Sequence, residues 1–151
     1  MSEKEVESIV ARTITRIVIP FIQIFGIYVI FHGETSPGGG FQGGVILGTS
    51  MILYGVVFSL RATKKKVPKK ILVVFMSIGL LIYSGIGLLD MVSGGKYLEY
   101  TSLPLPIPHH ELSSISILSV EIGIGLTVMS VIILLFIYLA GEKSGTGLDT
   151  W

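Results

Sequence analysis

The chain has 151 residues, of which half are hydrophobic and only 14% are charged. Ordinary soluble domains carry roughly 25% charged residues. This composition therefore excludes an ordinary soluble domain and indicates an integral membrane protein. Cysteine is absent, which excludes disulfides, thiolate metal sites and a cysteine nucleophile. The formal net charge is +1, and we predict no nucleic-acid partner.

Four segments are long enough to cross a bilayer, which takes about 20 apolar residues. They cover residues 13–31, 41–60, 71–92 and 113–140, and none has a Lys or Arg in its middle. Runs of this length without period-2 alternation predict helices rather than barrel strands. The predicted fold is therefore all-α, with residues 1–151 forming a single membrane domain that is a four-helix transmembrane bundle. The fourth segment exceeds the length of a span and should tilt or project.

The start of the chain does not resemble a signal peptide, because acids precede the first apolar stretch and that stretch continues past Pro20. We expect the N-terminus to be retained. Ten of the eleven Lys and Arg residues lie near the two termini or between the second and third spans, and Lys96 is the exception. The positive-inside rule then predicts a multi-pass protein of the cell membrane with both termini in the cytoplasm and the loop after the first span outside. The basic loop is either a topology signal alone or also binds anionic membrane lipids.

A glycine-rich loop separates the first two spans. Its motif residues are His32, Glu34, Pro37, Gly38, Gly39, Gly40, Phe41, Gly43 and Gly44. Ser36 followed by Pro37 is typical of a helix start, whereas the glycine triplet favours a start near Phe41. The Gly-Lys-Ser/Thr of a phosphate-binding loop is missing, which argues against nucleotide binding.

Two smaller patterns lie in and after this loop. Gly40, Gly44 and Gly48 recur every fourth residue, so they share one helix face that another backbone can approach closely. His32 and Glu34 are residue types that bind metals or relay protons. Two ligands two residues apart are a weak metal signal, so we favour a structural pair that fixes the loop, and we predict no metal site.

Polar residues also occur around the third and fourth spans. Asp90 ends the predicted third helix and is expected to lie in the interface, in contact with water. His109, His110 and Glu111 precede the fourth span, and adjacent histidine side chains diverge, so a solvated helix cap is favoured over a metal site.

Glu121 lies within the fourth span, where a carboxylate costs about 2.5 to 3.5 kcal/mol on insertion scales. No cation inside the spans is expected to pair with it, so the sequence predicts a partner subunit, water or a translocated ion. Gly125 lies one turn further on the same face, and Gly123 belongs to a second face with Ser119 and Thr127. Glu121 is either part of a proton or sodium path or a structural hydrogen-bonding group between helices.

These residues carry a family resemblance. The stretch from Phe31 to Gly44, followed downstream by the stretch from Glu121 to Thr127, resembles the MrpB/MnhB-type subunit of the multisubunit Mrp sodium/proton antiporters. The same module occurs in membrane-bound hydrogenases and sulfur-reductase complexes. The resemblance implies a non-catalytic membrane subunit without a cofactor. It also implies partners that resemble the A, C, D, F and G subunits of Mrp, or hydrogenase or sulfur-reductase subunits, with Na+ and H+ as the ions.

A second class of function is an independent small membrane protein, either a homo-oligomeric channel or a membrane enzyme. A channel would place polar residues repeatedly along one helix, which the sequence does not do. An enzyme would need a convergent set of reactive groups. The only candidates for such a set are His32, Glu34, His109 and His110. We therefore favour the accessory subunit and predict no catalytic residue.

Overall fold

The computed structural model describes residues 3–33, 38–100 and 108–143. These residues form helices and connections, and they contain no β-strand. The helices are α1 (Glu3–Phe31), α2 (Gly40–Phe58), α3 (Leu60–Lys66), α4 (Lys69–Val92) and α5 (His109–Lys143).

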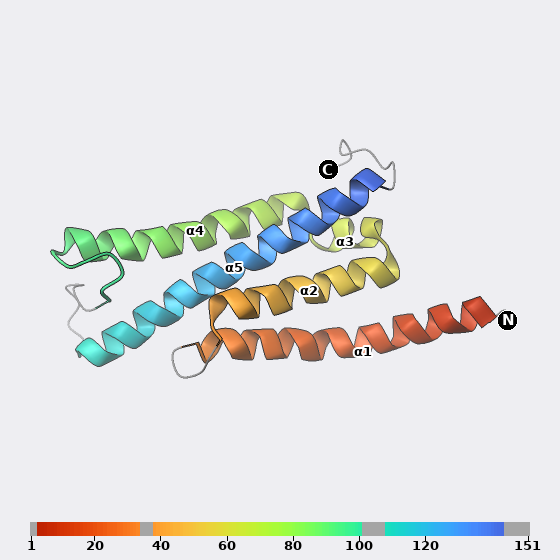
Figure 1. Ribbon diagram of the computed structural model, residues 1–151, viewed down its shortest axis with the longest axis horizontal. Helices are drawn as coiled ribbons and strands as arrows, with labels where there is room; N and C mark the ends of the chain where they lie inside the picture. Colours follow the sequence, from red (N-terminus) through yellow and green to blue (C-terminus); the bar gives the residue numbers. More distant parts are fainter. Residues whose placement is uncertain (1–2, 34–37, 101–107, 144–151) are drawn as a thin grey trace.

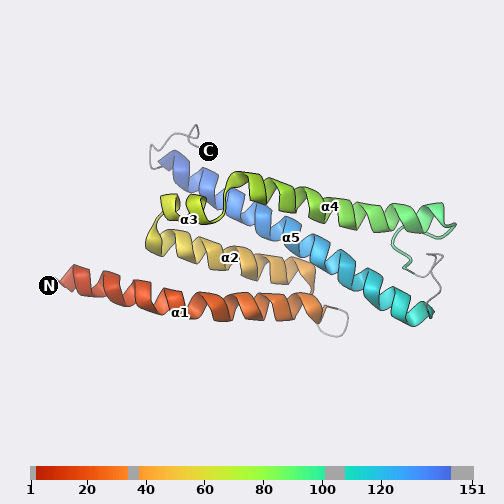
Figure 2. The same ribbon diagram turned by 180° about the vertical axis from the view of Figure 1, so that it is seen from behind.

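The long helices lie side by side in an order that differs from their order in the chain. Helix α2 packs between α1 and α5, and α5 packs between α2 and α4 (Figure 1). The start of α1, the short helix α3 and the end of α5 lie at one end of the bundle, and the view from behind shows the same arrangement (Figure 2). This agrees with the expectation that both termini and the basic segment share one side of the membrane. Assigning that side to the cytoplasm stays a prediction.

Four helices are long and apolar enough to cross a membrane, which confirms the all-α, four-span prediction. The qualifying ranges are Ser8–Phe31, Gly40–Phe58, Lys69–Val92 and His109–Gly141. Helix α1 begins ten residues before the predicted span and continues through Pro20. Helix α5 has 35 residues, so the expectation that the fourth segment is longer than a simple span is met.

The basic segment between the second and third spans was expected to be a loop, but most of it forms α3. Ser59 ends α2 with a φ of 128°, a value that only glycine adopts without strain. Its hydroxyl oxygen then accepts a hydrogen bond from the Ala62 N–H, which caps α3. Lys66 lies 4.5 Å from the ring centre of Tyr54, and Lys69 lies 5.5 Å from that of Tyr138. Cation–π contacts thus place these charges beside aromatic rings at this end of the bundle.

One cluster of buried apolar side chains lies toward the α3 end. It contains Leu72, Ile133 and Ile137. Many large apolar side chains face outward instead, and on α1 these include Phe21 and Ile24, which are 67% and 66% exposed. Such a surface is stable in lipid or against other membrane subunits and not in water.

Candidate functional site

The glycine motif forms a tight turn that leads into α2. Gly39 has a φ of 101°, in the region that favours glycine, and it is the N-cap residue of α2. The Gly43 N–H donates to the Gly39 carbonyl oxygen over 2.9 Å, which is the first hydrogen bond of the helix. Helix α2 therefore begins at Gly40, one residue from the start near Phe41 that the glycine triplet favoured. Gly39 has no side chain with which to cap the helix.

The carboxylate of Glu121 on α5 supplies that missing cap. The Gly40 N–H donates a short hydrogen bond to Glu121 Oε2. A Cβ atom at Gly39 would lie 2.5 Å from Glu121 Oε2, and one at Gly33 would lie 3.1 Å from Glu121 Cδ. Gly33, Gly39 and Gly40 thus leave the space in which the carboxylate sits. The structure therefore brings the glycine motif and Glu121 into contact.

This arrangement stabilises both groups. The first N–H groups of a helix have no partner within the helix, and its N-terminus carries a partial positive charge. A carboxylate placed there accepts a hydrogen bond and also interacts favourably with the helix dipole. The sequence argument named a partner subunit, water or a translocated ion to compensate Glu121, and it left a structural hydrogen bond between helices as the alternative role. It missed the backbone N–H of α2, which no residue identity reveals.

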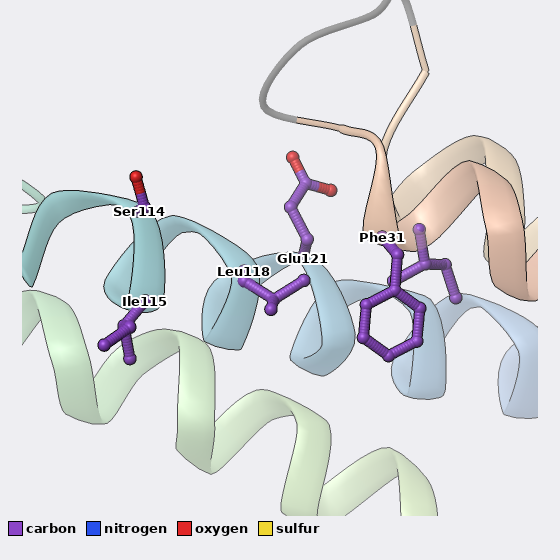
Figure 3. A pocket seen from close by; sticks show the side chains of 6 residues that line it. Phe31, Ser114, Ile115, Leu118 and Glu121 are labelled. Atoms are coloured by element: carbon purple, nitrogen blue, oxygen red, sulfur yellow. The ribbon is translucent and has the colours of Figure 1, made fainter. Parts of the chain in front are cut away.

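A pocket of about 150 Å³ adjoins the carboxylate. Its lining consists of Ile30, Phe31, Ser114, Ile115, Leu118 and Glu121. Figure 3 shows the Glu121 side chain rising from α5 toward the turn between α1 and α2, with Phe31 beside it at the end of α1. The lining is mostly apolar, so the Glu121 carboxylate is the dominant polar group of this pocket.

The predicted glycine face of α2 packs on α5. A Cβ atom at Gly44 would lie 2.7 Å from the Gly125 carbonyl oxygen, and one at Gly48 would lie 3.2 Å from Ile132 Cγ2. A Cβ atom at Gly40 would overlap the backbone of Glu121. In the structure, the helix that approaches this glycine face is α5. Gly43 lies on a different face, against Ile30 of α1.

The second predicted face of α5 packs on α4. A Cβ atom at Gly123 would lie 2.8 Å from the Gly79 carbonyl oxygen, and one at Gly79 would overlap Gly123 and Thr127. The Thr127 hydroxyl lies 2.9 Å from the Gly123 carbonyl and 3.4 Å from the Met76 carbonyl. Helix α5 is therefore packed on two faces, as its two sets of small residues predicted.

The remaining motif residues are less informative. His32 Nδ1 lies 3.0 Å from the Tyr28 carbonyl oxygen, and the two rings stack at 4.0 Å. Glu34 and Pro37 lie outside the described residues, so the predicted pairing of His32 with Glu34 stays a prediction. Phe41 is 63% exposed, and Gly38 adjoins Val29. In the described ranges, no three His, Cys, Asp or Glu side chains group closely enough to hold a metal ion.

The expectation that Asp90 is solvated is wrong. Asp90 has no exposed surface, and its Oδ2 accepts a hydrogen bond of 3.2 Å from the Tyr100 N–H. The connection after α4 folds back over the end of the helix and excludes water from it. Burial raises the pKa of the Tyr100 hydroxyl, and the charges of Tyr83, Asp90 and Glu121 raise it further. Tyr100 therefore lies within electrostatic range of both carboxylates.

The glycine turn, the embedded glutamate and the paired small faces can now be compared with known proteins. Residues 10–134 match the family model described as a domain related to the MnhB subunit of the Na+/H+ antiporter. The chain belongs to the MnhB family. This MnhB-family chain is 34% identical over 140 residues to a Staphylococcus haemolyticus protein named as antiporter subunit mnhB2, covering 90% of this chain and 96% of that protein.

Two further relatives carry the same name. The Staphylococcus aureus MRSA252 protein is 33% identical over 138 residues, and a Staphylococcus epidermidis protein is 32% identical over 142 residues. Each match covers 90% of this MnhB-family chain and 96% of the relative. The match thus includes both the glycine turn and Glu121, and the chain is a multi-pass membrane subunit of the Mnh/Mrp antiporter type.

Proposed function

We propose that this chain is a non-catalytic subunit that supports the assembly of a multisubunit sodium/proton antiporter and places one carboxylate beside its ion path. The observation that carries the proposal is the hydrogen bond between the Gly40 N–H and Glu121. It joins the start of α2 to the N-terminal half of α5, and α5 also contacts α4. The carboxylate therefore adds a polar contact to the packing of α2 on α5.

An ion path through this chain alone would be incomplete. Between residues 122 and 141, α5 contains no Asp, Glu, His, Lys or Arg. The facing part of α2 meets it through Gly44 and Gly48 and apolar side chains. A proton that reached Glu121 would have no further relay along this interface, so other subunits must supply the rest of a route across about 30 Å of hydrocarbon.

The pocket beside Glu121 favours the ion-path part of the proposal. It borders the carboxylate between the end of α1 and the N-terminal half of α5. Carboxylates buried within membrane segments mark ion and proton routes in many transporters. The names of the relatives favour an antiporter over the membrane arm of a hydrogenase or sulfur-reductase complex as the parent assembly.

Co-purification tests the assembly role. All subunits of the antiporter would be expressed, with a tag on this chain, in a host that lacks its own sodium/proton antiporters. We expect the A-, C-, D-, F- and G-like subunits to co-purify in mild detergent. We also expect omission of this chain to abolish both the complex and sodium/proton exchange in membrane vesicles. A stable homo-oligomer that retains no other membrane subunit would contradict the proposal and support the independent channel or enzyme.

The proposed topology has a separate test, which the absence of cysteine makes simple. Lys65 on α3 and Lys96 after α4 are both exposed, so each can be replaced by a single cysteine. In intact cells, a membrane-impermeant maleimide should label Lys96→Cys and leave Lys65→Cys unlabelled until the cells are opened. The opposite pattern would place the glycine turn and the termini on the other sides of the membrane.

A further inference from the structure

Asp90 is a fully buried carboxylate, and the interactions in the described residues do not satisfy it. Its Oδ2 accepts from the Tyr100 N–H, but its Oδ1 is buried and has no hydrogen-bond partner there. Burying a charged carboxylate is energetically unfavourable when it accepts only one hydrogen bond, from an uncharged donor. A buried orphan atom of this kind requires a physical explanation.

The position of Asp90 on α4 makes a negative charge there still less favourable. Asp90 lies in the last turn of the helix, where the dipole carries partial negative charge and where α4 has no basic residue. Glu121 shows the opposite situation, because it sits at the positive N-terminal end of α2. The helix dipole therefore stabilises the charge of Glu121 and disfavours that of Asp90.

The connection after α4 is held in a strained shape that keeps Asp90 covered. Leu98 and Tyr100 have φ values of 60° and 59°, in the left-handed region that is unfavourable for non-glycine residues. The Gly95 N–H donates to the Asp90 carbonyl oxygen over 3.0 Å, and the ring of Tyr97 packs against Gly87 on the preceding turn. These contacts bring backbone and aromatic groups over the carboxylate, and none of them adds positive charge.

Other charged groups near this end of α4 do not compensate Asp90. Lys96 has an exposed side chain, and its backbone N–H donates to Glu99 Oε2 over 2.6 Å. Tyr97 and Tyr100 have raised pKa values, so their hydroxyl groups carry no positive charge. Glu121, which contributes to the raised pKa of Tyr100, is an acid itself. The structure thus contains an excess of negative charge with one free acceptor oxygen.

We propose that Asp90 Oδ1 is the binding position of a single monovalent metal cation of the Na+ class, at the C-terminal end of α4. One carboxylate matches one positive charge, and a carboxylate oxygen beside helix-terminal carbonyl groups is the oxygen-rich environment that hard cations prefer. A divalent ion would need more acids, and the described residues hold no group of three. The inference deepens the proposed function, because it names a cation position within the same antiporter subunit.

Isotope labelling isolates Asp90 because the chain has only two aspartates, Asp90 and Asp149. The full-length Asp149→Asn chain, made with carboxyl-13C aspartate and placed in lipid nanodiscs, would carry the label at Asp90 alone. Infrared and solid-state NMR spectra would be recorded in Na+ and in N-methylglucamine, and at several pH values. We expect a carboxylate signal that changes when Na+ is exchanged for the large cation.

An Asp90 signal that is the same in Na+ and in N-methylglucamine would overturn the inference. The assembled antiporter gives a second measurement, the difference between its melting temperatures in Na+ and in N-methylglucamine, which Asp90→Asn should reduce. The exposed Glu99→Gln, in the same connection, should retain it. An unchanged difference in Asp90→Asn would also overturn the inference. Because these experiments detect bound cation and not transport, a negative result here would leave the assembly and exchange results of the proposed function standing.

Discussion

Glu121→Ala should disconnect the start of α2 from α5 and abolish sodium/proton exchange. In the unsubstituted chain, the Gly40 N–H donates to Glu121 Oε2. The substitution leaves this N–H without a partner inside the membrane. An unsatisfied buried donor costs about 1–3 kcal/mol, and the loss of a helix cap costs about 0.5–2 kcal/mol by itself. We expect a lower yield of assembled complex and a melting temperature several degrees lower, measured by size-exclusion chromatography after heating.

Glu121→Gln separates the structural role from the ion-path role. The amide oxygen of glutamine still accepts a hydrogen bond from the Gly40 N–H, so the complex should assemble with a smaller loss of stability. Glutamine cannot take up a proton or supply negative charge, and exchange in membrane vesicles should fall at least tenfold. Glu111→Gln is the matched control, because Glu111 lies in the exposed first turn of the same helix and should have no effect. Full exchange by an assembled Glu121→Gln complex would rule out the ion-path role and leave Glu121 as a cap.

The spans were predictable because the bilayer imposes one simple requirement on them. A segment that crosses it must be apolar over about 20 residues and must satisfy its own backbone hydrogen bonds. All four spans meet this requirement in sequence, and the second and third were located to within two residues at each end. The helix α3 was not foreseen. It depends on Ser59 adopting a strained backbone angle and then capping the next helix. The basic sequence of this segment indicates neither property of Ser59.

The parts of the site were predicted, but the contact between them was not. The embedded acid and the glycine spacing can be seen in the sequence, and each indicated a close neighbour. The group that meets Glu121 is a backbone N–H, which every residue except proline possesses. One signal was present: the residues just before α2, Gly38 and Gly39, have no side chain that can cap it. The start of α2 lacks a hydrogen-bond acceptor and Glu121 lacks a donor, so each can supply what the other needs.

Asp90 shows where local sequence reasoning fails. Its position after an apolar run predicted contact with water, as expected for an acid at the end of a span. The structure buries it because residues 93–100 fold back, with Leu98 and Tyr100 in the left-handed region. Neither residue type favours that conformation, so the cover over Asp90 comes from tertiary contacts. Its burial could be learned only from the fold.

Two glycines of α4 offer a matched test of the α4–α5 contact. At Gly79 a Cβ atom would overlap the Gly123 carbonyl and the Thr127 hydroxyl of α5, whereas at Gly85 no atom lies within 4 Å. Gly79→Ala should therefore force the two helices apart. Overpacking of this kind costs about 1–3 kcal/mol, and it should also break the contact of 3.4 Å between the Thr127 hydroxyl and the Met76 carbonyl.

Gly85→Ala makes the same chemical change in the same helix without the clash. It should be neutral or slightly stabilising, because alanine favours the helix over glycine by about 1 kcal/mol in soluble hosts. The comparison would use the melting temperatures of the two full-length variants in the same detergent, where only contacts within the chain contribute. Equal melting temperatures would mean that α4 does not approach α5 through Gly79. A lower value for Gly79→Ala alone would show that the small residues of α5 serve two neighbours, with Gly123 facing α4 while Glu121 and Gly125 hold α2. That division explains why one helix needs both an embedded acid and two separate glycine faces.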